Sequence, residues 1–198
     1  MRVKLFLASS NTGKLQEYRA LADSERGEIQ VELLPGFRGL DAFPEDAPTF
    51  AENAAGKALH YSRFTGETVV ADDSGLVVAS LDGAPGVRSA RYAGENATDA
   101  DRNAKLLGEL RAKTGEARNA KFVCVIAAAR KGKMLAVVSD FVEGTIANEP
   151  RGSGGFGYDP VFYFAPLKKT FGELTEAEKN RISHRGKAFA RLCDALLP

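Results

Sequence analysis

Hydrophobic and polar positions divide the first quarter of the chain into a strand, a helix, a second strand and a long loop. An apolar run over Arg2–Ala8 predicts a buried strand. After the small polar residues Ser9–Gly13, apolar residues recur at helical spacing from Lys14 to about Ala22. Ile29–Leu34 has the pattern of another strand. Pro35–Pro48 is rich in Pro, Gly and acidic residues and is long enough that we expect it to carry function.

The segment that begins at Thr49 has the pattern of an amphipathic helix. Apolar residues recur every four positions on its core face: Phe50, Ala54 and Ala58. A different face is polar and carries Asn53, Lys57 and His60. We therefore predict a helix with one side in the core and one side available for polar contacts.

The middle of the chain predicts another helix and a hairpin. Thr98 is suited to cap a helix over Asp99–Arg111. Lys121–Arg130 and Met134–Ile146 read as strands joined by the tight turn Lys131–Lys133. Because such a hairpin is antiparallel while the first elements have the strand–helix–strand order, we expect a mixed sheet.

The last third of the chain predicts a short strand followed by two helices. A glycine-rich stretch, Arg151–Asp159, precedes a short strand over Val161–Phe164, and Thr175–Glu178 fits a capping box that opens a short helix. Ser183 is suited to cap a final helix. The buried stripe expected on that helix consists of Phe189, Leu192, Cys193 and Leu196. No repeat, linker or low-complexity segment is evident, so we predict one α/β domain over residues 1–198.

Composition and charge narrow the function. Of the 198 residues 44% are hydrophobic, enough for a substantial core, and 27 basic residues nearly balance 26 acidic ones. The chain therefore lacks the overall field that binds nucleic acid or an anionic membrane, and an anionic substrate must be captured locally. No stretch approaches the ~20 apolar residues of a membrane span. Cys124 and Cys193 lie in apolar patterns without metal-like spacing, so we expect reduced core thiols and a cytoplasmic location.

A phosphate site is suggested where the first strand turns into the first helix. Ser9–Lys14 supplies hydroxyls, backbone N–H groups and an ammonium at a predicted helix N-terminus, an arrangement suited to an anion. The glycine spacing of a Walker loop is absent, and an ordinary polar turn with a surface lysine is the alternative.

Two adjacent carboxylates interrupt the strand predicted over Thr68–Val78. Asp72 and Asp73 stand between apolar Val69–Val70 and Leu76–Val78, where carboxylates are costly to bury unless a cation or donors compensate. Because strand side chains alternate, only one of the two can face a given side of the sheet. An acidic β-turn in water is the alternative.

Magnesium is the cation that best suits these residues. Glu45, Asp46 and Glu52 add oxygen ligands upstream, and Mg²⁺ prefers a few carboxylates together with waters and substrate phosphates. The two histidines, His60 and His184, are too far apart in the sequence for a zinc motif. No Ser/His/Asp order or nucleophile elbow supports covalent catalysis.

A ligand-binding end is suggested downstream. Gly152–Pro160 allows close backbone approach and offers aromatic faces for a planar base, although a floppy loop with core aromatics is the alternative. Lys179, His184 and Arg185 lie near the starts of two helices, where they can donate to carbonyl or phosphate oxygens. Solvated helix charges are the alternative reading.

Together these segments closely resemble the inosine/xanthosine triphosphate pyrophosphatase family. The resemblance spans almost the whole chain and rests on six motifs in order: Ser9–Lys14, Thr49–Ala54, Ala71–Leu76, Gly83–Tyr92, Gly154–Pro160 and Ser183–Gly186. It implies an elongated mixed β-sheet flanked by helices, two lobes with a central active-site cleft, and a homodimer. It also implies Mg²⁺-dependent hydrolysis of ITP, dITP and XTP to the monophosphate and pyrophosphate, which cleanses the nucleotide pool.

The resemblance also assigns roles to residues. It makes Asp73 the catalytic base and, with Glu45, a metal ligand. The substrate contacts that it implies are Ser9, Ser10, Asn11, Thr12, Gly13, Lys14, Lys57, Ser74, Phe156, Gly157, Tyr158, Asp159, Lys179, His184 and Arg185. Two other readings remain open: a pyrophosphatase for modified pyrimidine or methylated nucleotides, and a nucleotide-binding module without turnover.

Overall fold

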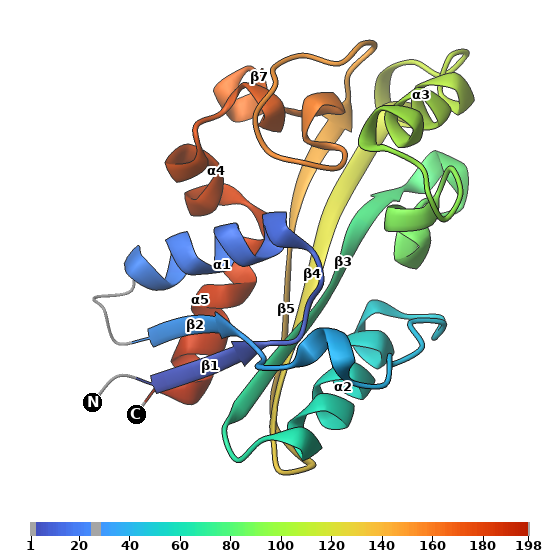
Figure 1. Cartoon of the computed structure of the whole chain (residues 1–198). Coiled ribbons are helices and arrows are strands. Elements are labelled where there is room, and N and C mark those ends of the chain that lie inside the picture. Colours follow the sequence, from blue (N-terminus) through green and yellow to red (C-terminus); the bar gives the residue numbers. More distant parts are fainter. Residues whose placement is uncertain (1–2, 25–28, 198) are drawn as a thin grey trace. The chain divides into compact units, whose positions relative to one another are not determined.

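The chain forms a mixed sheet flanked by helices, as predicted (Figure 1). The computed structural model describes residues 3–24 and 29–197. Seven strands lie in the order β2-β1-β3-β4-β5-β6-β7. Their bounds are β1 Val3–Leu7, β2 Ile29–Leu33, β3 Thr68–Val78, β4 Asn119–Arg130, β5 Lys133–Ile146, β6 Phe162–Phe164 and β7 Lys169–Thr170.

Strand directions confirm the mixed character of the sheet. β1 is parallel to both β2 and β3, whereas β6 is antiparallel to β5 and to β7. Neighbouring β4 and β5 are joined through Lys131 and Gly132, whose φ angles are both positive, at 52° and 72°. Two consecutive residues of positive φ fit the twist of a tight antiparallel hairpin, so the predicted turn is confirmed.

Five α-helices complete the main elements: α1 Thr12–Ser24, α2 Phe50–Tyr61, α3 Asp99–Glu109, α4 Glu176–Ile182 and α5 His184–Leu196. Thr98 caps α3 and Thr175 caps α4, each in a capping box with the acidic residue three positions on. From the sequence we predicted Thr98 as a cap and Thr175–Glu178 as a capping box, and both are confirmed. In each box the Thr and the acidic residue satisfy two otherwise orphaned backbone groups.

Predicted boundaries differ from the observed ones by a few residues. The first helix begins at Thr12 rather than Lys14, and α3 ends at Glu109 rather than Arg111. Arg2, the predicted first residue of the first strand, lies outside the described residues. Within the described ranges, no helix combines the length and apolar character needed to cross a membrane.

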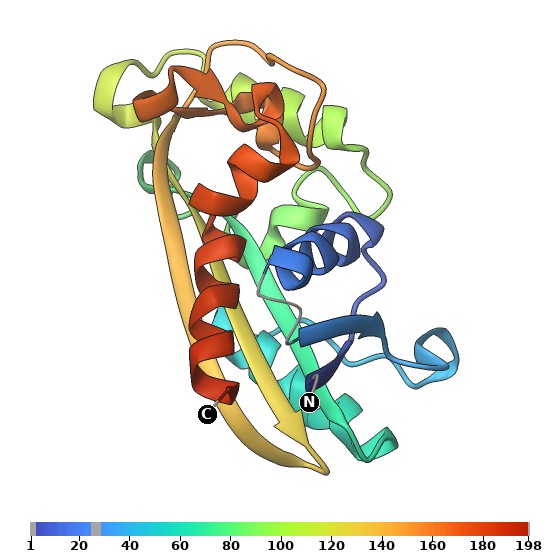
Figure 2. The same cartoon turned by 90° about the vertical axis from the view of Figure 1, so that its left-hand side faces the viewer.

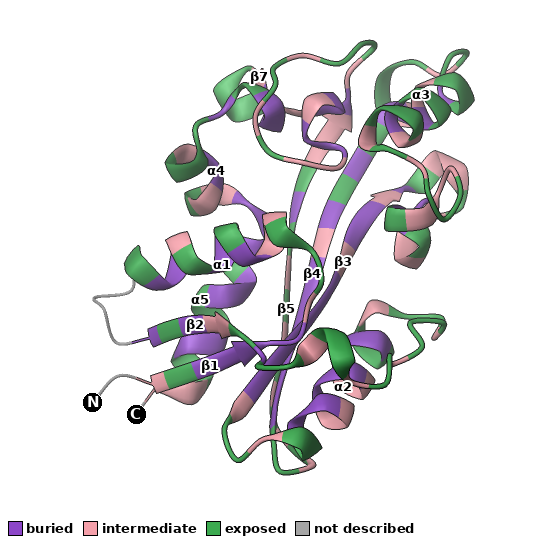
Figure 3. Cartoon of the chain, viewed as in Figure 1, coloured by how far each residue is buried: buried purple, intermediate pink, exposed green. Residues whose placement is uncertain are grey.

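Contacts between Cα atoms divide the chain into two compact units. Unit 1 comprises Met1–Asp73, Cys124–Asp140 and Arg185–Pro198, and unit 2 comprises Ser74–Val123 and Phe141–His184. The long strands β3, β4 and β5 contribute residues to both units, and β3 and β4 are mostly buried (Figure 3).

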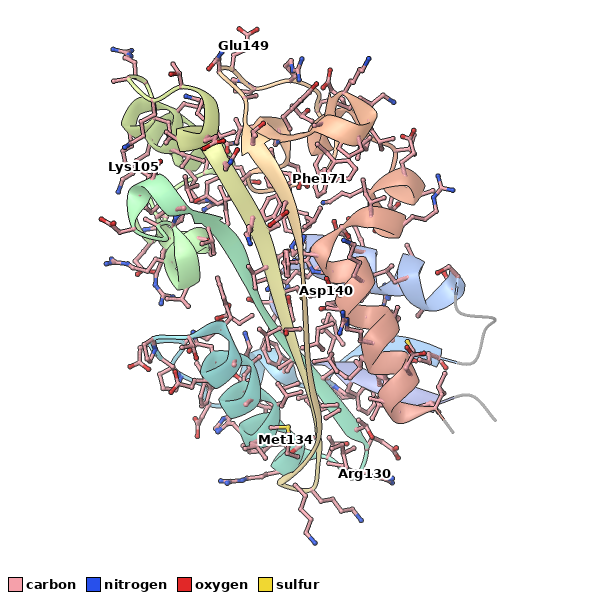
Figure 4. All side chains as sticks on the ribbon, turned by 180° about the vertical axis from the view of Figure 1, so that it is seen from behind. Lys105, Arg130, Met134, Asp140, Glu149 and Phe171 are labelled. Atoms are coloured by element: carbon pink, nitrogen blue, oxygen red, sulfur yellow. The ribbon has the colours of Figure 1, made fainter. Side chains whose placement is uncertain are left out.

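Unit 1 has helices on both faces of its strands. On one face α1 and α5 lie side by side (Figure 2), and the rings of Tyr18 and Phe189 are 5.6 Å apart in a cluster with Val70 and Ile126. Asp140 of β5 accepts a 2.7 Å hydrogen bond from an α5 arginine (Figure 4). On the other face α2 packs its alanines against alternate residues of β3 and β4. Cys124 and Cys193 are buried thiols outside any disulfide, as predicted.

Unit 2 has an aromatic core of its own. The rings of Phe122, Phe162 and Phe171 contact one another with centroids 4.5–5.9 Å apart. Phe171 is labelled in Figure 4. Buried Arg118 donates to the backbone carbonyls of Leu110, Ile146 and Ala147 at 2.6–2.8 Å and to that of Lys113 at 3.3 Å. Because these carbonyls lie at or just after the ends of α3 and β5, one guanidinium holds the ends of these two elements together.

Candidate active site

The loop between β1 and α1 presents the N-terminus of α1. Asn11 is the helix cap: its Oδ1 accepts a 3.0 Å hydrogen bond from the Lys14 N–H, and its own N–H donates to Ser9 Oγ at 3.1 Å. This cap explains why the helix begins at Thr12, before the first apolar residue that signals it. Ser10, Asn11 and Thr12 are exposed, so the loop is accessible to an anion.

The two aspartates lie within a continuous strand, and the β-turn reading is wrong. β3 runs from Thr68 to Val78 without a break, and Asp72 and Asp73 are only 1% and 7% exposed. Their side chains face opposite sides of the sheet. Asp72 contacts Lys14 of α1, whereas Asp73 contacts Asn53 of α2. Polar partners from distant segments therefore make burial of both carboxylates tolerable.

Asp72 belongs to a buried network of two acids and two cations. Its Oδ2 lies 2.9 Å from Lys14 Nζ and 3.7 Å from Arg185 Nε, and Arg185 Nη1 also pairs with Glu17 of α1. Burial raises the pKa of the Asp72 carboxyl, but the charges of Lys14 and Arg185 outweigh it and leave that pKa lowered. Although burial alone would lower the pKa of Arg185, Glu17 and Asp72 hold it well above its usual value.

Asp73 and Glu45 are the carboxylates on the α2 side. Asn53 Nδ2 donates to Asp73 Oδ2 at 2.9 Å, and Lys57, one helical turn further on, pairs with Glu45 at 2.7 Å. Burial raises the pKa of Asp73; the Asn53 hydrogen bond opposes that rise, and the charge of Glu45 adds to it. The pKa of this carboxyl is therefore higher than usual, which suits a proton acceptor.

The polar face of α2 is not a solvent face. Asn53 is fully buried and Lys57 is 6% exposed, whereas Phe50, predicted as core, is only half-buried. Glu52, which we expected among the oxygen ligands, instead accepts a 2.7 Å hydrogen bond from the helix cap Thr49.

The donor set around Asp73 fits magnesium. Across residues 3–24 and 29–197, no group of three or more His, Cys, Asp or Glu side chains is arranged to hold a metal. A pair of carboxylates without nitrogen or sulfur ligands is what Mg²⁺ uses when phosphates and waters supply the rest. Glu45 and Asp73 fit that description, with Glu45 41% exposed toward solvent.

The glycine-rich loop of unit 2 is ordered by buried side chains, so the floppy-loop reading is wrong. Asp159 accepts a 2.8 Å hydrogen bond from the Phe156 N–H and forms an ion pair with Lys179 of α4. The Lys179 ammonium also lies 4.9 Å from the centre of the Phe156 ring. Tyr158 donates its hydroxyl to the Ser89 carbonyl at 2.9 Å. The segment therefore brings an aromatic ring, a carboxylate and an ammonium into contact with one another.

The charged side chains at the starts of the last two helices are buried, so the alternative that they are solvated is wrong. Lys179, His184 and Arg185 are 4%, 3% and 2% exposed. The His184 ring is stacked on Phe122 of the unit 2 core, 4.7 Å between centres and 9° from parallel. These side chains are held in place by tertiary contacts rather than by water.

Sequence reasoning missed the residues that hold these groups. Glu17 pairs with Arg185, while Asp99 and Asn103 of α3 bond the peptide N–H and carbonyl of Gly157 at 2.7 and 3.0 Å. A signal was present: Glu17 and Asn103 are polar residues inside the apolar stripes of their helices. A polar residue at such a position is buried and needs a partner.

The predicted site residues fall into two groups. Unit 1 holds Ser9–Lys14, Glu45, Lys57, Asp73 and Arg185, and unit 2 holds Ser74, Phe156–Asp159, Lys179 and His184. Arg185 was assigned to the nucleoside end, but its bonded partners, Glu17 and Asp72, belong to unit 1. The ligand roles of all these residues stay predictions from the resemblance, as does the cleft.

Comparison with known proteins identifies the family. The model of the Ham1 family matches residues 5–195. A dITP/XTP pyrophosphatase of Geobacillus kaustophilus is 49% identical over 189 residues, which cover 96% of this chain and 92% of that protein. Solved Ham1 proteins of Coxiella burnetii and Staphylococcus aureus superpose with TM-scores of 0.85 and 0.84 at 42% and 38% identity. Each match covers 98% of this chain, and 98% and 97% of the respective relatives. The chain belongs to the Ham1 family.

Proposed function

We propose that this protein hydrolyses non-canonical purine nucleoside triphosphates, namely ITP, dITP and XTP, to the nucleoside monophosphate and pyrophosphate. The observation that carries the proposal is the buried Asp73, whose pKa is raised and which lies on the same side of β3 as Lys57 and Glu45. Relatives 43–49% identical bear the name dITP/XTP pyrophosphatase. Removal of such nucleotides keeps them out of the pool used for nucleic-acid synthesis.

Asp73 is the proposed base. It orients a water molecule and accepts its proton as the water oxygen bonds to the α-phosphorus and the bond from that phosphorus to the β-bridging oxygen breaks. Lys14 and Lys57 neutralise the negative charge that develops on the pyrophosphate leaving group. Mg²⁺, for which Glu45 and Asp73 are the proposed ligands, supplies positive charge to the phosphate oxygens when bound.

The triphosphate chain is proposed to bind along Ser9–Lys14. The α1 N-terminus offers backbone N–H groups and the adjacent hydroxyls of Ser9, Ser10 and Thr12. Asn11 is already used as the helix cap, which fixes the direction of those N–H groups.

The base is proposed to bind at the unit 2 segment and to be read through its 6-oxo group. A hypoxanthine or xanthine carbonyl accepts a hydrogen bond from Lys179 or Arg185, whereas adenine presents an amino donor at that position. A buried donor left unpaired can discriminate by up to ~10⁴–10⁵-fold. The proposed contacts in unit 2 are Ser74, Phe156, Gly157, Tyr158, Asp159, Lys179 and His184; Arg185, which belongs to unit 1, stays a proposed contact from the resemblance alone. Loss of ITP and ATP turnover in equal proportion in a Lys179→Met variant would contradict this assignment.

The central test is a panel of triphosphates with product identification. Wild-type protein with Mg²⁺ is expected to release pyrophosphate from dITP and XTP much faster than from ATP, GTP or modified pyrimidine nucleotides. Orthophosphate as the product would overturn the reaction class. Asp73→Asn is expected to lose turnover at saturating Mg²⁺, and an almost unchanged rate in that variant would refute the role of Asp73.

We also propose a cytoplasmic homodimer. The supporting observation is the outward face of β5, where Leu135, Val137 and Phe141 are 50%, 47% and 47% exposed at alternate positions. A second copy of the chain is the proposed occupant, because an exposed apolar face of this kind is removed from water when it packs against the same face of a symmetry mate. Sedimentation of wild type as a dimer and of Val137→Glu as a monomer is expected; a monomeric wild type contradicts the proposal.

A further inference from the structure

One side chain of α2 joins the proposed catalytic carboxylate to the loop that carries the other proposed metal ligand. Asn53 is fully buried, and its carboxamide makes three hydrogen bonds. Nδ2 donates to Asp73 Oδ2 at 2.9 Å and to the Ala47 carbonyl at 3.4 Å, while Oδ1 accepts from the Ala47 N–H at 3.0 Å. A carboxamide can donate to a carboxylate through its nitrogen and accept from a peptide N–H through its oxygen at once.

The loop of residues 40–48 has no helix or strand and packs along α2. We call this loop the strap. Moving along α2 from Asn53, Lys57 pairs with Glu45, the Tyr61 hydroxyl accepts from the Phe43 N–H at 3.1 Å, and a His60 ring nitrogen lies 3.0 Å from the Asp41 carbonyl. The loop therefore runs antiparallel to the helix.

Gly56 makes this close approach possible. A Cβ added at Gly56 would lie 2.4 Å from the Phe43 ring, so a larger residue would push the loop away from α2. Glu45 is thus held in two ways. Its carboxylate pairs with Lys57, and the peptide of Ala47, two residues further on, is bonded by Asn53. Asn53, which holds the strap at Ala47, also bonds Asp73.

We propose that Asn53 is a positioning residue that sets the separation of Asp73 and Glu45 and so the affinity of the site for a divalent cation. The inference rests on the proposed function, because it takes these two carboxylates as the metal ligands. Without the carboxamide, Asp73 loses its amide donor and Glu45 loses one of its two anchors. Partners that orient metal ligands are worth about 10–100-fold in metal affinity or activity when they are removed.

The matched control is His60. A His60→Ala variant loosens the same strap at Asp41 but removes no contact with Asp73. Asn53→Ala removes both functions of the carboxamide, and Asn53→Ser is a milder variant that keeps a small polar side chain in case the alanine variant does not fold. Thermal unfolding establishes that each variant is folded before its metal affinity is compared.

The experiment measures pyrophosphate release from dITP as a function of Mg²⁺, and Mn²⁺ binding to the protein alone by electron paramagnetic resonance. For Asn53→Ala or Asn53→Ser we expect the Mg²⁺ concentration at half-maximal rate and the Mn²⁺ dissociation constant to rise about 10–100-fold. The KM for dITP at saturating Mg²⁺ should change much less. His60→Ala should stay within about twofold of wild type.

An unchanged metal dependence in the folded Asn53 variants overturns the inference, and so does an equal loss in His60→Ala. If Mn²⁺ does not bind wild type in the absence of nucleotide, the Mg²⁺ dependence of the rate decides. The proposed function fails separately, when wild type itself releases no pyrophosphate from dITP; in that case the Mn²⁺ titration still tests whether Asn53 controls the carboxylate pair.

Discussion

Asp72→Asn is the substitution that most directly tests the reading of the buried charge network in unit 1. Asparagine has almost the same shape as aspartate, so it removes one negative charge without leaving a cavity. Lys14 then loses the carboxylate 2.9 Å away, and Arg185 keeps Glu17 as its remaining acidic partner. The variant therefore isolates the electrostatic role of Asp72 from its packing.

The expected loss of stability follows from the geometry. At an effective dielectric constant of ~20, attraction at the observed 2.9 and 3.7 Å amounts to about 6 and about 4 kcal/mol. Most of this is offset, because Asp72→Asn also removes the cost of burying a carboxylate. Removing one member of a buried ion pair typically costs about 3–5 kcal/mol. The Lys14 side chain is 15% exposed and can regain water, so we expect the lower end, about 3 kcal/mol.

The assay is thermal unfolding at neutral pH. For a chain of this size each kcal/mol shifts the midpoint by roughly 2–4 °C, so Asp72→Asn should lower it by roughly 6–12 °C. Glu32→Gln is the control: Glu32 pairs with Lys4 at 2.8 Å, but both side chains are more than a third exposed, and the loss should stay below about 1 kcal/mol. A shift of less than ~2 °C for Asp72→Asn, or an equal shift for Glu32→Gln, would refute the reasoning.

The pH dependence supplies a second check. The pKa of Asp72 is lower in the folded chain than in the unfolded chain. The stabilisation is therefore fully present above the unfolded value of ~3.9 and is lost as the pH falls through the lowered folded value. The difference between wild type and Asp72→Asn should stay constant from about pH 5 to pH 8 and close only in stronger acid.

Three further outcomes test unit 2. Gly155→Ala should raise the KM for dITP several-fold, because φ is +71° and the new Cβ would lie 2.0 Å from Asp159 Oδ2, displacing that carboxylate; an unchanged KM contradicts the proposed pocket. Arg118→Met should lower the free energy of unfolding in urea by at least about 2 kcal/mol, because each buried carbonyl left without a donor costs ~1–3 kcal/mol. The control Arg130→Met loses one exposed hydrogen bond and should change the free energy of unfolding little. Hydrogen bonds from the α4 cap lower the pKa of Glu178. The Tm difference between wild type and Glu178→Ala should therefore be largest at neutral pH and shrink as the pH falls through that lowered pKa. A difference independent of pH would show that the ionised Glu178 carboxylate does not stabilise the cap.

Elements with local signals were predictable from the sequence. The Thr98 cap of α3, the capping box of α4, the hairpin turn and the family were all confirmed, because each depends on residues close together in the chain or on ordered motifs. The N-terminus of α1 was placed two residues late. Its signal, Asn11 as a cap, was present but was read as part of the phosphate loop.

Burial of charge was harder to predict. Asp72–Gly75 has the composition of a turn, and the partners that let it be a strand are distant in sequence: Lys14 lies 58 residues from Asp72, and Asn53 lies 20 residues from Asp73. Likewise nothing near Arg185 in the sequence reveals Glu17, from which it is separated by 168 residues. A local sequence pattern does not reveal which distant residues will pair with a buried charge. The energy that decides between turn and strand here comes from those tertiary contacts.

The opposite directions of Asp72 and Asp73 also constrain how the length of this segment can vary. Deleting one residue of β3 upstream of the pair, with the rest of the sheet unchanged, would bring Asp73 beside Lys14 and place Ser74 opposite Asn53. Inserting one residue would turn Asp72 toward α2 and put Ala71 in the place beside Lys14, with Asp73 moved two positions further along the α1 side. Insertions and deletions should therefore be excluded from the first part of β3, whereas the loop of residues 40–48 can change in length as long as Ala47 and Glu45 keep their contacts with α2.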